Sequence, residues 1–286
     1  MRLEGRAILI TGASRGLGKA IAEACVREGA NVFLTARDAD ALEQARIEIS
    51  DSAPAGSAVK AFSADISDPD QALRLVEAFR EAFPRVHGLV NNAAMLGPVG
   101  RLEDANWERW TETIHTNLLG PARLCGLLLP AFRRNGYGKI VNISGGGATA
   151  PRPRFSAYGA SKAALVRLTE TLAEETTGSG IDINAIAPGA MNTRLLDETL
   201  AAGPDRAGEQ IYFQAVKQKE DGGAGPEKAA ALSVFLLSAE SDGISGRLLA
   251  ALWDDWPRLP DRRDALRGTD VYTLRRIIPA DRGFDW

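Results

Sequence analysis

The sequence is poor in the residues that build metal centres and disulfide frameworks. Among its 286 residues it has two cysteines, Cys25 and Cys125, and two histidines, His87 and His115. Two cysteines in apolar, helical contexts make no disulfide framework, and two histidines are too few for a histidine-rich metal site. We therefore expect no metal site.

An excess of positive charge and long apolar runs are also missing. Lysine and arginine total 34 against 37 aspartate and glutamate residues, so the net charge is −3 and no basic excess awaits a phosphate backbone. No apolar run approaches the length of about 18 residues that a membrane-spanning helix needs. The N-terminus leads directly into a strand-like run and lacks the features of a secretion signal. The sequence predicts a cytoplasmic protein with no nucleic-acid or membrane partner.

What the sequence does contain is a regular alternation of short apolar runs and longer helical segments. Its hydrophobic share of 45% and charged share of 25% are those of an ordinary globular protein. The predicted strands are Ala7–Thr11, Asn31–Thr35, Val59–Ser63, Gly88–Asn91, Lys139–Ser144, Asp182–Ala187 and Arg247–Leu252. Predicted helices lie near residues 16–28, 38–50, 69–82, 106–134, 157–177 and 226–238. This alternation predicts a Rossmann-type, doubly wound α/β fold with a parallel sheet of about seven strands and helices on both faces.

Two segments depart from the alternation and define the expected domain organisation. Residues 193–225 form a long, glycine-containing connection, which is typical of a lid over a substrate. Residues 253–286 hold three of the five tryptophans, too many aromatic side chains for a disordered tail. We expect one domain over residues 1–252 and a C-terminal extension over 253–286 that packs on the body or on a partner subunit.

A glycine-rich loop follows the first predicted strand and opens the next helix. Gly12 permits a tight turn, Gly16 lets the backbone approach a pyrophosphate, and Gly18 allows close helix packing. The helix N-terminus adds free N–H groups and a partial positive charge. The predicted cofactor-binding residues of this loop are Gly12, Ser14, Arg15, Gly16, Leu17 and Gly18; the alternative is a plain strand–helix turn.

The end of the second predicted strand bears on the choice of cofactor. It carries no acidic residue where a dinucleotide-binding fold grips the ribose 2′-hydroxyl, and Arg37 stands there instead. Together with Arg15, its guanidinium group suits a 2′-phosphate, so the sequence favours NADP(H) over NAD(H). In the alternative interpretation, Arg37 is a solvated residue that pairs with Asp38.

A phenol and an ammonium group lie one helical turn apart in Tyr158-Gly-Ala-Ser-Lys162. A nearby lysine favours the phenolate, so we expect Lys162 to lower the pKa of Tyr158. The phenol would then exchange a proton with a carbonyl or hydroxyl oxygen. This pair alone is common by chance and gains weight from its place after the fifth predicted strand.

In their order along the chain, these motifs resemble the short-chain dehydrogenase/reductase family in its compact single-domain branch. The resemblance covers about residues 5–252. The matching positions are Gly12, Gly16 and Gly18, the pair Asp65-Ile66, Asn91-Asn-Ala-Ala94, Asn117, Tyr158 with Lys162, and Pro188-Gly189 with Thr193.

The resemblance implies roles at the adenine end of a nucleotide. Asp65 would hydrogen-bond the adenine amino group, and Ile66 would pack beside the ring. Asn91 would support the central strand and border the cofactor. The alternative interpretation makes Asp65 the N-cap of the helix that follows.

The resemblance also implies roles at the nicotinamide end. Lys162 would hold the ribose hydroxyls, while Pro188, Gly189 and Thr193 would border the nicotinamide. Asn117 would hold a water that links Lys162 to solvent, or in the alternative it is an ordinary satisfied amide in the middle of a helix.

One departure from the family concerns the residue that polarises the substrate carbonyl. The family has Ile-Ser-Ser after the fifth strand, whereas this chain has Ile143-Ser144-Gly145-Gly146-Gly147. The position thirteen residues before Tyr158 is Gly145, and Ser144 comes one residue early. Either Ser144 turns inward as a catalytic residue, or a glycine N–H replaces the hydroxyl as the donor, or catalysis is weak or absent.

The sequence therefore predicts an oxidoreductase that interconverts a carbonyl and a secondary alcohol with NADP(H). Tyr158 is the expected general acid and base, with Lys162, Ser144 and Asn117 as further catalytic residues. Arg152 and Arg154 precede the catalytic helix and suit an anionic substrate, or they belong to a stiff surface loop. The family's commonest assembly implies a homotetramer or homodimer. The competing functions are a non-catalytic NADP(H)-binding regulator and a nucleotide-sugar dehydratase or epimerase.

Overall fold

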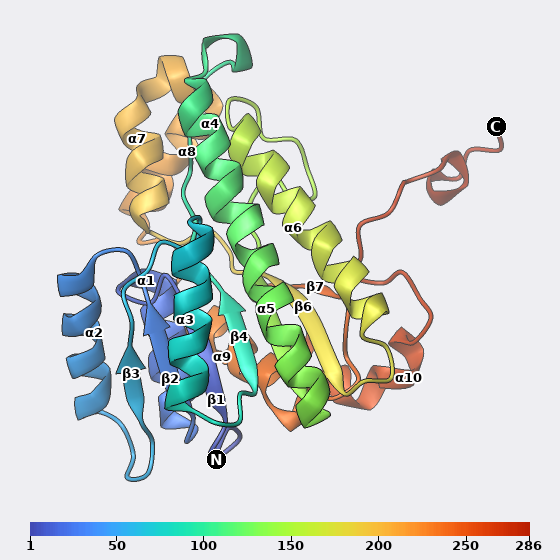
Figure 1. Ribbon diagram of the computed structural model, residues 1–286. Coiled ribbons are helices and arrows are strands. Elements are labelled where there is room, and N and C mark those ends of the chain that lie inside the picture. The colour runs from blue at the N-terminus through green and yellow to red at the C-terminus, as the bar shows by residue number, and fades with distance from the viewer.

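A seven-stranded parallel sheet forms the centre of the computed structural model, which describes residues 1–286 (Figure 1). Its order is β3-β2-β1-β4-β5-β6-β7. The strands are β1 Ala7–Thr11, β2 Asn31–Thr35, β3 Val59–Ala61, β4 Gly88–Asn91, β5 Gly138–Ile143, β6 Ile181–Ala187 and β7 Leu248–Ala250. Every pairing is parallel, which confirms the predicted Rossmann-type fold. The strand order reverses direction between β1 and β4, where ligands of such sheets bind.

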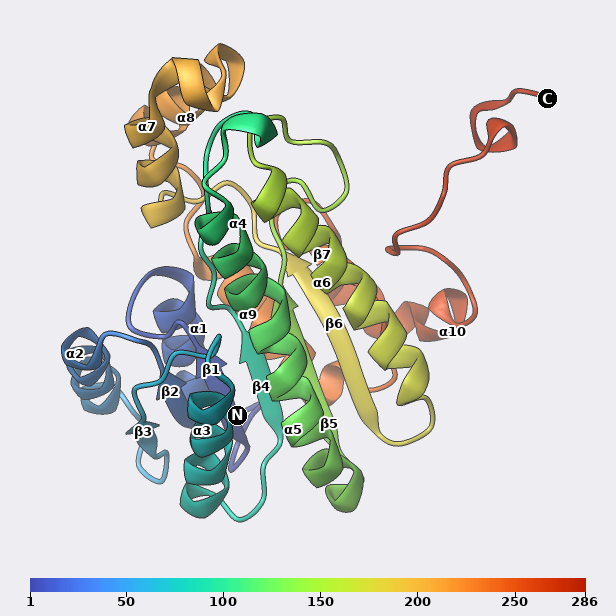
Figure 2. The ribbon, with the colours of Figure 1, turned by 45° about the horizontal axis from the view of Figure 1, so that its top comes forward.

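Helices cover both faces of the sheet (Figures 1 and 2). They are α1 Gly16–Arg27, α2 Ala39–Asp51, α3 Pro69–Ala82, α4 Trp107–Ile114, α5 Gly120–Asn135, α6 Ser156–Glu175, α7 Arg194–Ala207, α8 Glu209–Glu220, α9 Glu227–Leu237 and α10 Arg263–Leu266. One large apolar core joins α1 and α9 to the sheet, and a second joins α3 and α5 to the opposite face. β1 and β5 are buried along their whole length and are mostly apolar, because both faces of the sheet are covered.

Polar residues fix where several helices begin. The carboxylate of Asp38 accepts a hydrogen bond from the backbone N–H of Ala41 at the start of α2, and Asp68 does the same at the start of α3. Asp68, not Asp65, is therefore the N-cap of α3. At the start of α1, by contrast, no side chain caps the helix, so its first N–H groups remain available to an anion.

The helix predicted over residues 106–134 is interrupted. It divides into α4, the π-helical turn η2 over His115–Leu119, and α5, which ends at Gly136 in the left-handed conformation. Asn117 lies inside η2. Hydrophobic periodicity does not predict a π-helical turn. Such turns are frequent at functional sites.

The connection over residues 193–225 is mostly helical. Helices α7 and α8 form a pair that stands above the carboxyl ends of the strands (Figure 2). Gly203, with φ of 73°, breaks α7 near its end, and Gly208, with φ of 83°, separates the two helices.

The extension after β7 has two parts. Its first part packs on the body, with Leu259 and Leu266 buried against the core that α1 and α9 share. Beyond about residue 275 the chain leaves the body and runs outward to the C-terminus (Figure 1). Phe284 and Trp286 there are 55% and 82% exposed. None of the helices is long and apolar enough to cross a membrane.

Candidate active site

A single large cleft lies at the carboxyl ends of the strands, beside the reversal between β1 and β4. Its volume is about 1620 Å³, above the roughly 300–1,000 Å³ of ordinary ligand pockets, so it has room for a dinucleotide together with a substrate. Most of the predicted site residues line it: Gly12, Ser14, Arg15, Gly16, Leu17, Arg37, Asp65, Ile66, Ser144, Tyr158, Lys162, Pro188, Gly189 and Thr193. Gly18, Asn91 and Asn117 lie outside its lining.

The glycine loop is packed so closely that side chains are excluded at two positions. A Cβ atom at Gly18 would clash with the carbonyl of Gly12, and one at Gly12 would lie 2.9 Å from Asn92 Nδ2. At Gly16, with φ of 56°, a Cβ atom would meet nothing within 4 Å, because that side faces the open cleft. A close-packed loop that is open toward the cleft, at the uncapped N-terminus of α1, fits a pyrophosphate.

Asn92, which follows β4, holds this loop in place, a role that the sequence analysis did not assign to it. Its side-chain amide donates to the carbonyls of Thr11 and Gly12, at 2.9 and 3.2 Å, and it lines the cleft. Its neighbour Asn91 is buried instead, and donates to Asn142 Oδ1 at 2.8 Å. Its support of the central strands is therefore seen directly, and its place beside the cofactor stays a prediction.

The far end of the cleft carries a guanidinium group with only weak partners. The Nη1 atom of Arg37 lies 3.7 Å from Asp65 and 3.9 Å from Glu112, and the side chain is about half exposed. Asp38 is occupied in capping α2 and does not pair with Arg37. The Oδ1 atom of Asp65 accepts hydrogen bonds from the backbone and side chain of Ser67.

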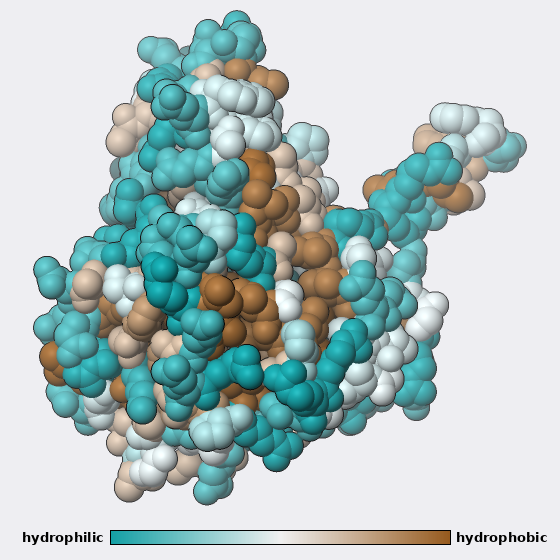
Figure 3. Space-filling view, viewed as in Figure 1, coloured by the Kyte–Doolittle hydropathy of each residue, from teal (hydrophilic) through white to brown (hydrophobic).

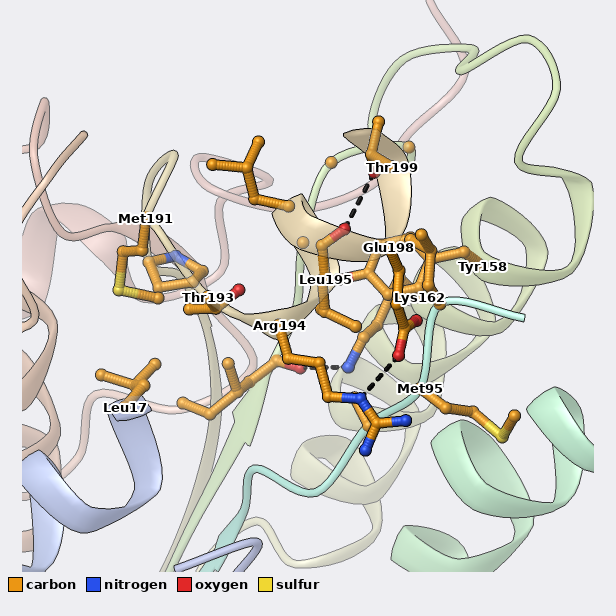
Figure 4. Close-up of a pocket in the computed structure, with 18 of the residues that line it drawn as sticks. Leu17, Met95, Tyr158, Lys162, Met191, Thr193, Arg194, Leu195, Glu198 and Thr199 are labelled. Carbon is orange, nitrogen blue, oxygen red and sulfur yellow. Dashed lines mark hydrogen bonds and ion pairs between the residues drawn. The ribbon is translucent and has the colours of Figure 1, made fainter. Parts of the chain in front are cut away.

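Tyr158 and Lys162 lie on α6 and face the cleft (Figure 4). The two side chains are 6% and 2% exposed. The Nζ atom of Lys162 donates to the carbonyl of Ile143 at 2.8 Å and lies 5.8 Å from the centre of the Tyr158 ring. Thr193, at the start of α7, stands on the other side of the cleft in the same view.

Burial changes the pKa values of both groups. It lowers the pKa of Lys162 to about 8, because the ammonium ion is removed from water. It raises the pKa of Tyr158 above its usual value, and Arg152 is the charged group that opposes this rise. The net direction is thus a rise, because desolvation of the phenolate outweighs the charge of Arg152. The expected effect of Lys162 on the phenolate during the reaction stays a prediction.

In the turn after β5, Gly145 is the residue that packs against Tyr158. A Cβ atom at Gly145 would clash with the Tyr158 hydroxyl, so the backbone of Gly145 lies directly against the phenol. The hydroxyl of Ser144 is buried and hydrogen-bonds to no protein group. The backbone N–H groups of Gly145 and Gly146 also donate to no protein acceptor.

Asn117 is buried and all its side-chain contacts are internal. Its oxygen accepts from the N–H of Met95 at 2.9 Å, and its nitrogen donates to the carbonyl of Met95 and to the hydroxyl of Ser161. It ties η2 to α6 close to Lys162, and its link to a water stays a prediction.

The comparisons with known proteins agree with this fold. The family model described as short chain dehydrogenase matches residues 6–202. The chain is 35% identical over 251 residues to 3beta-hydroxysteroid dehydrogenase 1 of Eggerthella lenta, covering 86% of this chain and 92% of that protein. It is 32% identical over 260 residues to D-beta-hydroxybutyrate dehydrogenase of Cupriavidus necator, covering 88% and 96%.

Two solved structures are similar in the same way. Levodione reductase superimposes with a TM-score of 0.80 at 29% identity, over 87% of this chain and 96% of that one. Actinorhodin polyketide ketoreductase with NADPH gives 0.78 at 27% identity, over 86% and 95%. The fold and cleft define a Rossmann-type nucleotide-binding protein. The chain belongs to the short-chain dehydrogenase/reductase family, oxidoreductases that bind NAD(P)(H) and act on small molecules.

Proposed function

We propose that this protein interconverts a carbonyl compound and a secondary alcohol with NADP(H), using Tyr158 as general acid and base. The observation that carries the proposal is the burial of Tyr158 and Lys162 in the same cleft as the glycine loop. The bound cofactor would supply the hydride to the carbonyl carbon in the reductive direction.

The residues of the chain would move the proton and stabilise charge. The phenol of Tyr158 donates its proton to the carbonyl oxygen, and its raised pKa keeps it protonated until then. The ammonium group of Lys162 stabilises the negative charge left on the phenolate. The free N–H groups of Gly145 and Gly146, or the hydroxyl of Ser144, would polarise the carbonyl oxygen.

To test the reaction, the protein is incubated with NADPH and a panel of ketones and aldehydes, and in the reverse direction with NADP⁺ and secondary alcohols. The proposal expects NADPH consumption matched by formation of an alcohol. Absence of turnover across both panels would contradict it.

The preference for NADP(H) is supported by Arg15 and Arg37, which both line the cleft, and by the lack of an acidic residue at the end of β2. A guanidinium contact with a 2′-phosphate is charge-assisted and contributes about 1.5–3 kcal/mol. Arg37→Asp should therefore reduce the ratio of NADPH to NADH affinity at least tenfold, measured by cofactor titration. Equal affinities for both cofactors in the unaltered protein would refute the assignment.

We further propose a homo-oligomer, a dimer or tetramer, and a cytoplasmic location. Hydrophobic residues gather on the face over α5 and α6 (Figure 3), and Leu119 beside α5 is 41% exposed. A solution mass of at least two chains, measured by light scattering, is expected.

Both cysteines are free and buried, as suits a reducing compartment. We also propose that α7 and α8 cover the substrate.

A further inference from the structure

Arg152 is a half-buried cation that has no anionic partner in the protein. Its guanidinium carbon lies 4.1 Å from the centre of the Phe155 ring and 6.0 Å from the centre of the Tyr158 ring. No carboxylate forms an ion pair with it, and the titratable group nearest to it is the phenol of Tyr158, which is neutral because burial raises its pKa. A cation removed from water without a partner is unfavourable. Its environment therefore favours an anion that arrives from the cleft.

The other cations around the cleft are held differently. Arg194 on α7 is paired with Glu198 at 2.7 Å, and Lys219 on α8 is paired with Asp197 at 2.7 Å. Arg154 lines the cleft and makes no ion pair. The carboxylate of Glu209, which is exposed at the start of α8, also lines the cleft without an ion pair. Arg152 is distinguished from these groups by its position beside the Tyr158 ring. The other cation near that ring, Lys162, already donates to the carbonyl of Ile143.

The glycine triplet gives a ligand access to this arginine. A Cβ atom at Gly146 would lie 3.7 Å from Arg152 Nη1, so the guanidinium group borders the turn that also meets the Tyr158 hydroxyl at Gly145. Because Gly145 and Gly146 carry no side chains, the turn itself places no side chain between Tyr158 and Arg152. An anionic group on a small substrate can therefore reach Arg152 while its carbonyl oxygen is beside Tyr158.

We propose that Arg152 is the anion-binding residue of the substrate site, and that the substrate is a small carbonyl compound or alcohol bearing a carboxylate or phosphate group close to the reacting carbon. The planar guanidinium fork matches both groups, through two parallel charge-assisted hydrogen bonds. This inference rests on the proposed oxidoreductase function and assigns its substrate class.

The test compares pairs of substrates that differ only in the anion. The pairs are 3-oxobutanoate, 4-oxopentanoate and 5-oxohexanoate with their methyl esters, and dihydroxyacetone phosphate with dihydroxyacetone. The phosphate pair distinguishes a phosphate subsite from a carboxylate subsite. For the best pair we expect kcat/KM of the anionic member to exceed that of its neutral partner at least tenfold, as a hydrogen bond to a charged group predicts.

The variant Arg152→Gln separates anion binding from an effect through Tyr158. Loss of the cation raises the pKa of Tyr158 further, which changes kcat for both members of a pair alike. The ratio between the members therefore isolates the anion contact, and it should fall at least tenfold. Arg152→Lys should restore part of the ratio. Arg134→Gln, an exposed arginine of α5 without an ion pair, changes net charge equally and should leave the ratio unchanged.

Three results would overturn the inference or separate it from the proposed function. A ratio near one in the unaltered protein, or an unchanged ratio in Arg152→Gln, contradicts the anion site but leaves carbonyl reduction intact. If no member of any pair turns over, calorimetric binding of the same compounds to the NADPH complex decides. Binding of the anions that weakens tenfold in Arg152→Gln supports the site, and absent or unchanged binding refutes it.

Discussion

At the scale of single residues, Gly145 is the position where we expect the addition of one Cβ atom to affect catalysis most. A Cβ atom there clashes with the Tyr158 hydroxyl, whereas one at Gly146 makes only an ordinary contact with Arg152. Neither glycine has a positive φ, so both positions accept alanine without backbone strain. Gly145→Ala should displace the phenol and reduce kcat by roughly a hundredfold, the cost of a misplacement of about 1 Å.

The matched control for this prediction is Gly146→Ala, for which we expect a much smaller loss of kcat. The comparison is made by steady-state kinetics of both variants. Their melting temperatures should be nearly identical, which excludes misfolding as the cause of a difference. Equal losses would show that the close approach of Gly145 to Tyr158 has no part in catalysis.

Lys162 gives the reaction a defined pH dependence. Burial lowers its pKa to about 8 and raises that of Tyr158, so the ammonium group loses its proton before the phenol does. Below about pH 8 Lys162 is charged and stabilises the developing phenolate, and above it this charge is lost. With saturating cofactor and substrate, kcat for reduction should therefore fall as pH rises through about 8. A kcat that stays constant up to about pH 10 would rule out this role for Lys162.

At the scale of secondary-structure elements, Arg247 anchors the C-terminal extension to β7. Its guanidinium group donates to the carbonyls of Leu266, Thr269 and Val271 at 2.6–2.8 Å. Arg247→Ala removes these hydrogen bonds. Because a hydrogen bond to a charged group contributes about 1.5–3 kcal/mol, the free energy of unfolding should decrease by at least that amount. We expect a lower melting temperature and faster proteolysis within residues 253–274.

Arg258→Ala is the control for the extension. Arg258 is mostly exposed and makes one ion pair with Asp255 at 3.5 Å, so its loss should change stability by less than about 1 kcal/mol. If both variants were cleaved at the same rate, the anchoring role of Arg247 would be refuted.

Local signals explain which elements could be predicted from the sequence. The glycine loop and the apolar strands depend on neighbours in the chain, and the predicted fold is confirmed. The cap of α3 at Asp68 rather than Asp65 was not predicted, because both carboxylates precede the helix within a few residues. The turn η2 depends on side-chain contacts of Asn117 with residues 22 and 44 positions away, and periodicity does not report it.

The charge around Tyr158 shows what sequence spacing does not predict. Lys162, one turn away, directs its ammonium group to the carbonyl of Ile143, while Arg152 reaches the tyrosine ring from the preceding loop. That loop includes Arg154 with φ of 72°, a conformation rare outside glycine. Neither the loop path nor the balance between desolvation and attraction can be obtained from a Tyr-x-x-x-Lys motif.

At the scale of the whole molecule, the sheet brings segments from the entire chain to one cleft. The glycine loop after β1, the turn after β5, the start of α6 and the start of α7 meet there. Figure 4 shows Leu17 of α1, Tyr158 of α6 and Thr193, the residue before α7, around this space. The glycine loop and Tyr158 therefore lie in different parts of one cleft, and under the proposed function a variant of Tyr158 can lose proton transfer while it keeps nucleotide binding.

The most direct measurement of the central claim is the rate of NADPH oxidation with a reducible ketone by Tyr158→Phe. Removal of a general acid costs about a hundredfold to ten-thousandfold. The account predicts a loss of kcat in this range, with NADPH affinity and melting temperature close to those of the unaltered protein. An unchanged kcat in a variant that still binds NADPH would contradict it.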